Sequence, residues 1–187
     1  MKSKVIDFWE ISYREEVSSK PSLRFFNPFF ASLSKPHPIL TTPGANPYEV
    51  NKSVIQLRML SGRYRDDRLL RHWTPDNDQG TCKLCLTYVG DFEHYLSSCV
   101  ALNPRRQELF KWWLEFSEDD KYLTDLLNAK INSDSDRFTR FVLDPPSDHD
   151  FIELSQAKVI DIEVVFRLTR TFCYSIHRAR LTFLSEP

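Results

Sequence analysis

Apolar residues recur at helical spacing along most of the chain, most clearly between residues 159 and 184. One stripe of this segment is apolar and carries Ile162, Val165, Phe166, Phe172, Cys173, Ile176 and Phe183. A second face carries Arg167, Arg170, His177 and Arg178. This two-sided pattern predicts a long amphipathic helix over about 159–184, with Cys173 as a core residue.

Weaker patterns of the same period predict further helices upstream. The segments are 1–20, 47–60, 69–73, the stretch after Asn103-Pro104, and the stretch "KYLTDLLNAK". Asn103 is suited to a helix cap and Pro104 to the first helical position. The last stretch lies within the acidic region 114–136, which we interpret as a solvated connector around that helix.

Helix-breaking residues separate these segments. Residues 21–46 are rich in proline and predict an extended arm, whose Phe25, Phe26, Phe29 and Phe30 we expect to dock on the body of the protein. The stretches "TPDNDQGT" and "FVLDPPSDHD" predict breaks in regular structure. The sequence therefore predicts a mostly α protein: an N-terminal helix (1–20), a Pro-rich arm (21–46) and a helical domain (47–187).

The composition supports a folded protein. Hydrophobic residues make up 41% of the 187 residues and aromatic residues 13%, which is enough for a core and is not typical of a disordered chain. The apolar runs are far shorter than a membrane span, and the charged N-terminus has no apolar signal core. We therefore expect an intracellular protein of the nucleus or cytoplasm that does not associate with membranes.

Three of the four cysteines lie close together in the segment "TCKLCLTYVGDFEHYLSSC". The spacing is Cys82-x2-Cys85-x8-His94-x4-Cys99, which supplies four ligands for a tetrahedral Zn²⁺ ion. Asp91 is placed to cap a short helix that presents His94. The alternative is a set of buried free cysteines beside a surface histidine. We expect a structural zinc knuckle over 82–99, because four protein ligands leave no open position for catalysis.

Basic residues concentrate just before this cluster. Six Lys or Arg and two Asp lie between residues 52 and 72, a local excess of four positive charges in a chain of net charge −1. Arginine suits phosphate contacts and base stacking. The candidate nucleic-acid contacts are Arg58, Arg63, Arg65, Arg68, Arg71, Arg105, Arg106, Arg170 and Arg178. The alternative is that Asp67 forms ion pairs with Arg63 and Arg71 at helical spacing.

The letters Tyr64-Arg65-Asp66-Asp67 match the Y-x-D-D box of polymerases. Such a box lies in a hairpin with apolar flanks, whereas arginines flank this one, and the roughly 60 residues upstream are too few for a polymerase palm. We expect Asp66 and Asp67 to cap the next helix or to pair with neighbouring arginines. No catalytic residue is assigned.

Several motifs in order resemble the C-terminal region of non-LTR (LINE-like) retrotransposon reverse transcriptases, over about residues 21–184. They are "PHPILTTPGANPYEVNKSVIQLRMLSGRYRDDRLLRHW", the Cys-x2-Cys pair, "EHYLSSC", and "FVLDPP" followed by "VFRLTRTFCYSIHRARL". The resemblance implies a zinc-binding region downstream of the polymerase domain, with Cys82, Cys85, His94 and Cys99 as the matching ligands. It also implies a non-catalytic role in holding RNA or DNA during target-primed reverse transcription.

The alternative function is a structural or protein-interaction module. In that case the aromatic arm and the acidic segment 114–136 would dock on the polymerase core of the same polyprotein or on another partner. No endonuclease segment and no polymerase core is recognisable in these 187 residues. Binding of RNA or DNA is therefore the leading expectation, with Zn²⁺ as the structural cofactor.

Overall fold

The computed structural model describes residues 2–26, 37–41, 46–71 and 80–185, and most of them are helical. The longer helices are α1 (Lys2–Ser19), α3 (Pro47–Leu60), α6 (Asn103–Ser117), α7 (Lys121–Ile131), α8 (Ser135–Leu143), α9 (His149–Gln156) and α10 (Ile162–Ser185). The shorter ones are α2 (Pro38–Thr41), α4 (Asp67–Leu70) and α5 (Phe92–Ser97). Within these ranges the only β contact is an isolated antiparallel bridge between Thr81 and Val89. The predicted mostly α class is confirmed.

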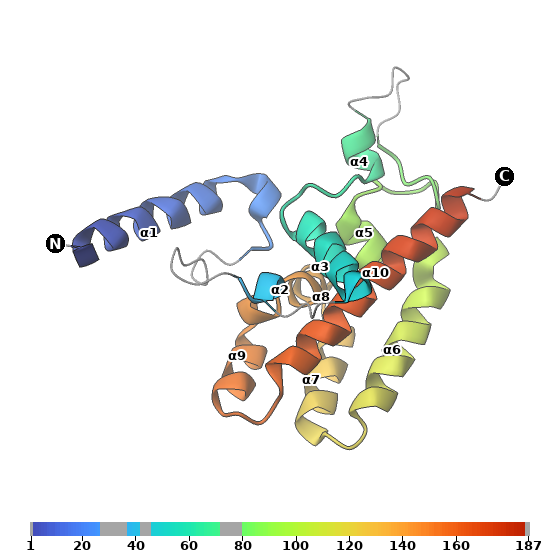
Figure 1. Cartoon of the computed structure of the whole chain (residues 1–187). Helices are drawn as coiled ribbons and strands as arrows, with labels where there is room; N and C mark the ends of the chain where they lie inside the picture. The colour runs from blue at the N-terminus through green and yellow to red at the C-terminus, as the bar shows by residue number, and fades with distance from the viewer. Residues whose placement is uncertain (1, 27–36, 42–45, 72–79, 186–187) are drawn as a thin grey trace.

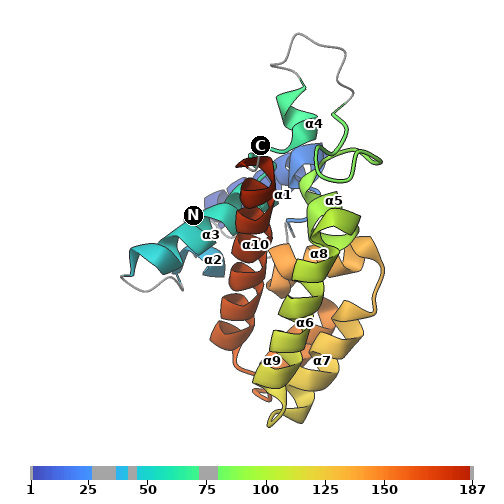
Figure 2. The ribbon, with the colours of Figure 1, turned by 90° about the vertical axis from the view of Figure 1, so that its right-hand side faces the viewer.

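Helix α10 runs through the middle of the body, with α3, α6 and α8 packed around it (Figure 1). Figure 2 shows α6 and α7 side by side along one flank of the molecule. Phe172 of α10 lies at the centre of an aromatic cluster, with ring centroids 5.1 Å from Trp113 and 5.4 Å from Phe138. Edge-to-face and tilted pairs of this kind add roughly 0.5–1.5 kcal/mol each beyond the area that they bury.

Asx side chains start many of the helices by capping free backbone amides. Six of them accept a hydrogen bond from an amide two or three residues ahead: Asn46, Asp66, Asp91, Asp120, Asp134 and Asp148. A cap of this type stabilises a helix by about 1 kcal/mol. Two of the acidic residues in the segment 114–136 therefore have a specific structural role at the starts of α7 and α8.

The predicted C-terminal helix exists but begins at Ile162 rather than at residue 159. Lys158 has a left-handed φ of 55°, and the Asp161 side chain accepts a hydrogen bond from the Glu163 amide at 2.8 Å, so the helix starts after this turn. Ile162 and Phe183 lie on the predicted apolar stripe but are exposed. Ile162 and Phe183 lie near the two ends of the helix, whereas Val165 and Phe166, one turn into it, are fully buried.

The segment "FVLDPPSDHD" was wrongly predicted to be a break throughout. Phe141, Val142 and Leu143 form the last turn of α8 and are buried. Only the next few residues break the helix, with a 3-10 turn at Pro145–Ser147 before α9 begins. Two adjacent prolines end a helix at this point, but they do not prevent helix formation before it.

Helix α1 matches the predicted N-terminal helix and extends away from the body (Figure 1). The chain after it docks on the body as expected: Phe25 is buried and its ring packs edge-on against Phe92 at 5.7 Å. The arm is not uniformly extended, because Pro21–Leu23 form a 3-10 turn and Pro38–Thr41 form α2. The predicted docking of Phe29 and Phe30 lies outside the described residues.

Candidate metal centre

A tight turn brings Cys82 and Cys85 to the same side of the chain. The Cys82 amide donates to the Tyr88 carbonyl at 2.7 Å, and the Leu86 amide donates to the Cys82 carbonyl at 2.8 Å. Leu86 has a φ of 57°, in the left-handed region that a non-glycine residue rarely adopts. The turn therefore depends on one strained residue placed directly after the second cysteine.

Helix α5 presents His94 to these cysteines. Asp91 caps the helix by accepting a hydrogen bond from the His94 amide at 2.9 Å, as predicted. Cys99 follows the helix, and its amide donates to the His94 carbonyl at 2.7 Å. The ligand atoms of Cys82, Cys85, His94 and Cys99 all lie within 4.8 Å of one another, so these side chains are close enough to hold one metal ion.

The protonation of these groups in the metal-free protein follows from their surroundings. Burial raises the pKa of Cys82 to about 12 and also raises the pKa of Cys99. Burial also raises the pKa of Cys85, but hydrogen bonds from the Thr87 and Tyr88 amides and with Cys82 and Cys99 together outweigh it, and the net shift is downward. Burial lowers the pKa of His94, which keeps its imidazole neutral, the form that binds metals. A bound cation would favour the thiolates.

The groups behind the ligands fix their orientation. Nδ1 of His94 lies 3.1 Å from the Ser98 hydroxyl, while Nε2 lies 3.2 Å from Sγ of Cys85. Ser98 therefore orients the ring so that Nε2 points at the cysteines, as outer-shell partners do in metal sites. Arg106 donates from Nη2 to the Cys99 carbonyl at 2.6 Å and from Nη1 to the Tyr95 carbonyl at 3.3 Å.

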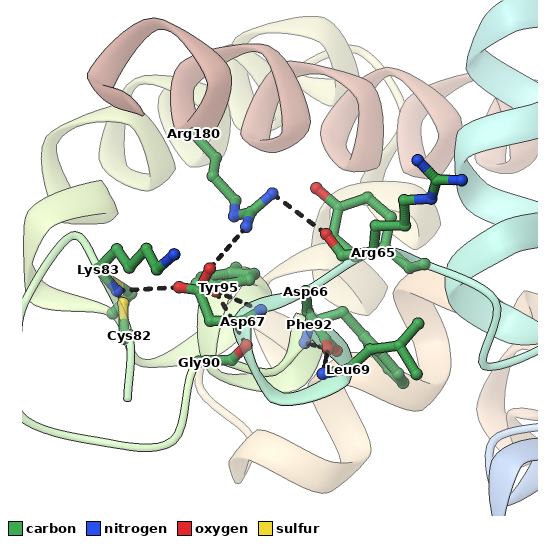
Figure 3. Close-up of polar contacts among 12 residues, drawn as sticks. Arg65, Asp66, Asp67, Leu69, Cys82, Lys83, Gly90, Phe92, Tyr95 and Arg180 are labelled. Atoms are coloured by element: carbon green, nitrogen blue, oxygen red, sulfur yellow. Dashed lines mark hydrogen bonds and ion pairs between the residues drawn. The ribbon is translucent and has the colours of Figure 1, made fainter. Parts of the chain in front are cut away.

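Asp66 and Asp67 form the polar network next to this centre (Figure 3). Asp66 accepts hydrogen bonds from the Leu69 amide at 2.7 Å and from the Phe92 amide at 3.2 Å. Asp67 accepts from the Lys83 amide at 2.9 Å through Oδ2, and the Tyr95 hydroxyl donates to the same oxygen at 2.7 Å. The expected capping role of Asp66 is confirmed.

The ion-pair partner of Asp67 is Arg180 of α10 rather than Arg63 or Arg71. Nη2 of Arg180 lies 2.9 Å from Oδ1 of Asp67, and both side chains are buried. Nη1 of Arg180 also donates to the Arg65 carbonyl at 3.3 Å. The two aspartates thus join the α4 segment to the cysteine turn, α5 and α10.

Gly90 completes this network because only a glycine fits there. Its carbonyl accepts from the Arg68 amide at 3.2 Å and lies 2.9 Å from the Tyr95 hydroxyl, which shares its one proton between this carbonyl and Oδ2 of Asp67. A Cβ atom on Gly90 would lie 2.6 Å from the Tyr95 hydroxyl and 2.8 Å from Cβ of Asp67. The backbone therefore approaches α4 and α5 more closely than any side chain would allow.

The predicted arginines divide into two groups. Arg106 and Arg170 are buried, and they are corrected to structural residues: Arg106 holds the Cys99 carbonyl, and Arg170 donates to the Phe166 carbonyl and to the Ser53 hydroxyl. Burial lowers the pKa of both guanidinium groups. The others are exposed: Arg58, Arg63, Arg65, Arg68, Arg71, Arg105 and Arg178.

The sequence pattern missed Arg180. This residue follows Ile176 by four positions and Cys173 by seven, so it continues the apolar stripe of α10. A charge on a buried stripe requires a buried partner, and Asp67 is that partner. The position of Arg180 on the stripe was the signal that could have identified it.

Comparisons with known proteins identify no relative of this chain. No protein-family model matches this chain, and neither a curated protein nor a solved structure matches it. None of the helices in the described ranges is long and apolar enough to cross a membrane. The function proposed below therefore rests on the residues of the chain itself.

Proposed function

We propose that this chain is a zinc-stabilised domain that binds RNA or DNA and has no catalytic role of its own. The observation that carries the proposal is the Cys3His cluster, which lies directly beside a segment rich in exposed arginines. The resemblance to the C-terminal region of non-LTR retrotransposon reverse transcriptases supports the same function. Its role there would be to hold RNA or DNA during target-primed reverse transcription.

Zinc is the metal that the ligand set favours. Thiolate and imidazole ligands in a tetrahedron select Zn²⁺, and Zn–S bonds of about 2.3 Å place two sulfurs about 3.8 Å apart. Sγ of Cys82 and Sγ of Cys99 lie 3.8 Å apart, and Sγ of Cys85 lies 3.2 Å from Nε2 of His94. Four protein ligands fill the tetrahedron, so the ion would stabilise the fold rather than activate water.

The exposed arginines would contact the phosphates. Arg63, Arg65 and Arg68 lie in the short stretch between α3 and the first residues of α4, and the network around Asp67 ties this stretch to the metal centre. Tyr88, at the tip of the cysteine turn, is 62% exposed and offers a ring on which a base can stack. The metal would thereby fix the position of the groups that bind nucleic acid.

The carboxylates of Asp66 and Asp67 are assigned a structural role in this proposal. Both are 2% exposed, and their oxygens accept hydrogen bonds from amides of three different segments and from Arg180. Catalytic metal ions in polymerases need carboxylates that converge on an open site. These carboxylates instead connect parts of the fold.

The test is the binding of labelled single-stranded RNA and DNA by the zinc-loaded chain. We expect one zinc ion per chain by elemental analysis, and an affinity that falls steeply as salt rises, because phosphate contacts release counterions. A zinc-loaded chain that retains neither RNA nor DNA at low salt would refute the proposal.

A protein-interaction role is the second candidate, and α1 is the observation that favours it. Trp9 and Ile11 are 57% and 56% exposed on this projecting helix. The partner would be the reverse transcriptase core of the same polyprotein. Serine at both positions should then abolish association with that core and leave nucleic-acid binding unchanged, whereas unchanged association would exclude this role for α1.

A further inference from the structure

A basic cleft lies between the end of α3, the turn that follows it, α4 and the last turns of α10. Its volume is about 740 Å³, within the range of ligand-binding pockets. The polar residues that line it are Arg58, Arg63, Tyr64, Arg65, His177 and Arg180. The other described residues of its wall are aliphatic, and none is acidic.

Three of these arginines are available to a ligand. Arg58, Arg63 and Arg65 are exposed, and none of them forms an ion pair with another described residue. Burial lowers the pKa of His177, and the charges of Arg180, Arg178 and Arg58 lower it further. A concave surface lined by charges of one sign concentrates counterions, so this cleft attracts anions.

Arg180 forms a fixed wall of the cleft. It is 4% exposed and is held by Asp67 and by the Arg65 carbonyl, with its guanidinium 4.9 Å from the centroid of the Tyr95 ring. Its Nε is buried and has no hydrogen-bond partner among the described residues. Arg180 therefore adds a fixed positive charge to the wall of the cleft, while its guanidinium stays bound to Asp67.

A second, smaller cavity continues along α10. Its volume is about 310 Å³, and its lining is Tyr48, Arg105, Tyr174, Ser175 and Arg178. The Tyr174 ring of this cavity lies 6.3 Å from the His177 ring of the first cleft, so side chains in contact line the two cavities. The Tyr48 ring packs edge-on against Tyr174 at 5.4 Å and remains 52% exposed. This cavity therefore combines arginine with an accessible aromatic ring.

We infer that the two cavities form one binding track for single-stranded nucleic acid. Backbone phosphates lie against Arg58, Arg63 and Arg65, and a base stacks on Tyr48. The inference rests on the proposed function and gives it a location. Single strands are bound by this combination of basic groove and aromatic platform, whereas a duplex keeps its bases stacked inside and offers phosphates alone.

The experiment uses the full zinc-loaded chain and a fluorescent twelve-nucleotide RNA, with the matching DNA strand and duplex as further probes. The cleft variant is Arg58→Gln, Arg63→Gln and Arg65→Gln together. The control variant is Lys111→Gln, Lys121→Gln and Arg137→Gln. It removes the same charge from exposed positions on α6, α7 and α8, outside both cavities. Zinc content and thermal melting confirm that each variant is folded.

The cleft variant should bind the single strands at least about tenfold more weakly, and the control variant should bind like the wild type. The slope of log affinity against log salt should fall by about 2, since each lost phosphate contact on a single strand contributes about 0.7. Tyr48→Ala should weaken single-strand binding about fivefold or more, and duplex binding hardly at all.

The outcomes separate the inference from the function on which it rests. A cleft variant that binds single strands as tightly as the control overturns the track and leaves the proposed function standing. A wild-type chain that binds no nucleic acid overturns both. Either of two results would overturn the assignment to single strands. One is that Tyr48→Ala weakens the binding of single strand and duplex equally. The other is that polyglutamate competes for the chain as well as an unlabelled single strand does at the same charge concentration.

Discussion

At the residue scale, the most informative contact is the buried ion pair of Asp67 and Arg180. The pair joins residues 113 positions apart, and both side chains are buried. It explains the buried Asp67 in a segment rich in arginine, whereas the neighbouring Asp66 caps α4. Asp67 bonds to the cysteine turn, α5 and α10 at once, so its carboxylate connects the candidate metal centre to the helical body.

Removing one partner of this pair should destabilise the protein strongly. Asp67→Ala leaves the Arg180 guanidinium buried without its counter-charge, and we expect the free energy of unfolding to fall by about 3–5 kcal/mol. Urea denaturation of the zinc-loaded protein measures the change. Arg137→Ala, which removes an exposed pair with Asp134, should cost less than about 1 kcal/mol. Equal effects of the two substitutions would show that the Asp67 pair has no special role.

Gly90 is the second sensitive position at this scale. Gly90→Ala places a methyl group against the Tyr95 hydroxyl and Asp67, and we expect a loss of about 1–3 kcal/mol from overpacking. In a Tyr95→Phe background the same substitution should cost less, because the nearest atom is gone. A double-mutant cycle by urea denaturation tests this, and strict additivity would contradict the predicted contact.

At the element scale, the sequence predicted those helices whose apolar face or capping residue can be recognised from neighbouring positions in the chain. The apolar stripe marked α10, and Asp91 marked the start of α5. The burial of Arg106 and Arg170 was not predictable in this way, because their acceptors, such as the Cys99 and Phe166 carbonyls, become available only in the folded chain. The length of α8 was missed because two prolines obscured the helix that ends before them.

The cysteine turn offers a prediction at the same scale. Leu86 is 76% exposed and has a φ of 57°, a conformation that costs an L-residue roughly 1–2 kcal/mol. Leu86→Gly should therefore stabilise the zinc-loaded protein by up to about 1 kcal/mol, since little buried area is lost. Thermal melting measures the shift. A lower melting temperature would mean that Leu86 contributes contacts that outweigh its backbone strain.

At the scale of the whole molecule, the chain has a net charge of −1 but separates its charges. Aspartates of the segment 114–136 cap α7 and α8, while exposed arginines line the cleft beside the last turns of α10. The four candidate ligands could be predicted from their spacing, because the turn and the short helix that position them are formed by residues close together in the sequence. The cleft could not be predicted from the sequence, because α3, α4 and α10 come together to form it only when the chain folds.

The central claim is that a bound metal holds a nucleic-acid-binding surface in place. The most direct measurement is the binding of labelled single-stranded RNA by one protein sample, first zinc-loaded, then after chelation, and then after Zn²⁺ or Mg²⁺ is added back. We predict salt-dependent binding that is lost on chelation and restored by Zn²⁺ but not by Mg²⁺. Equal binding with and without the metal, or no binding in any state, would contradict the account.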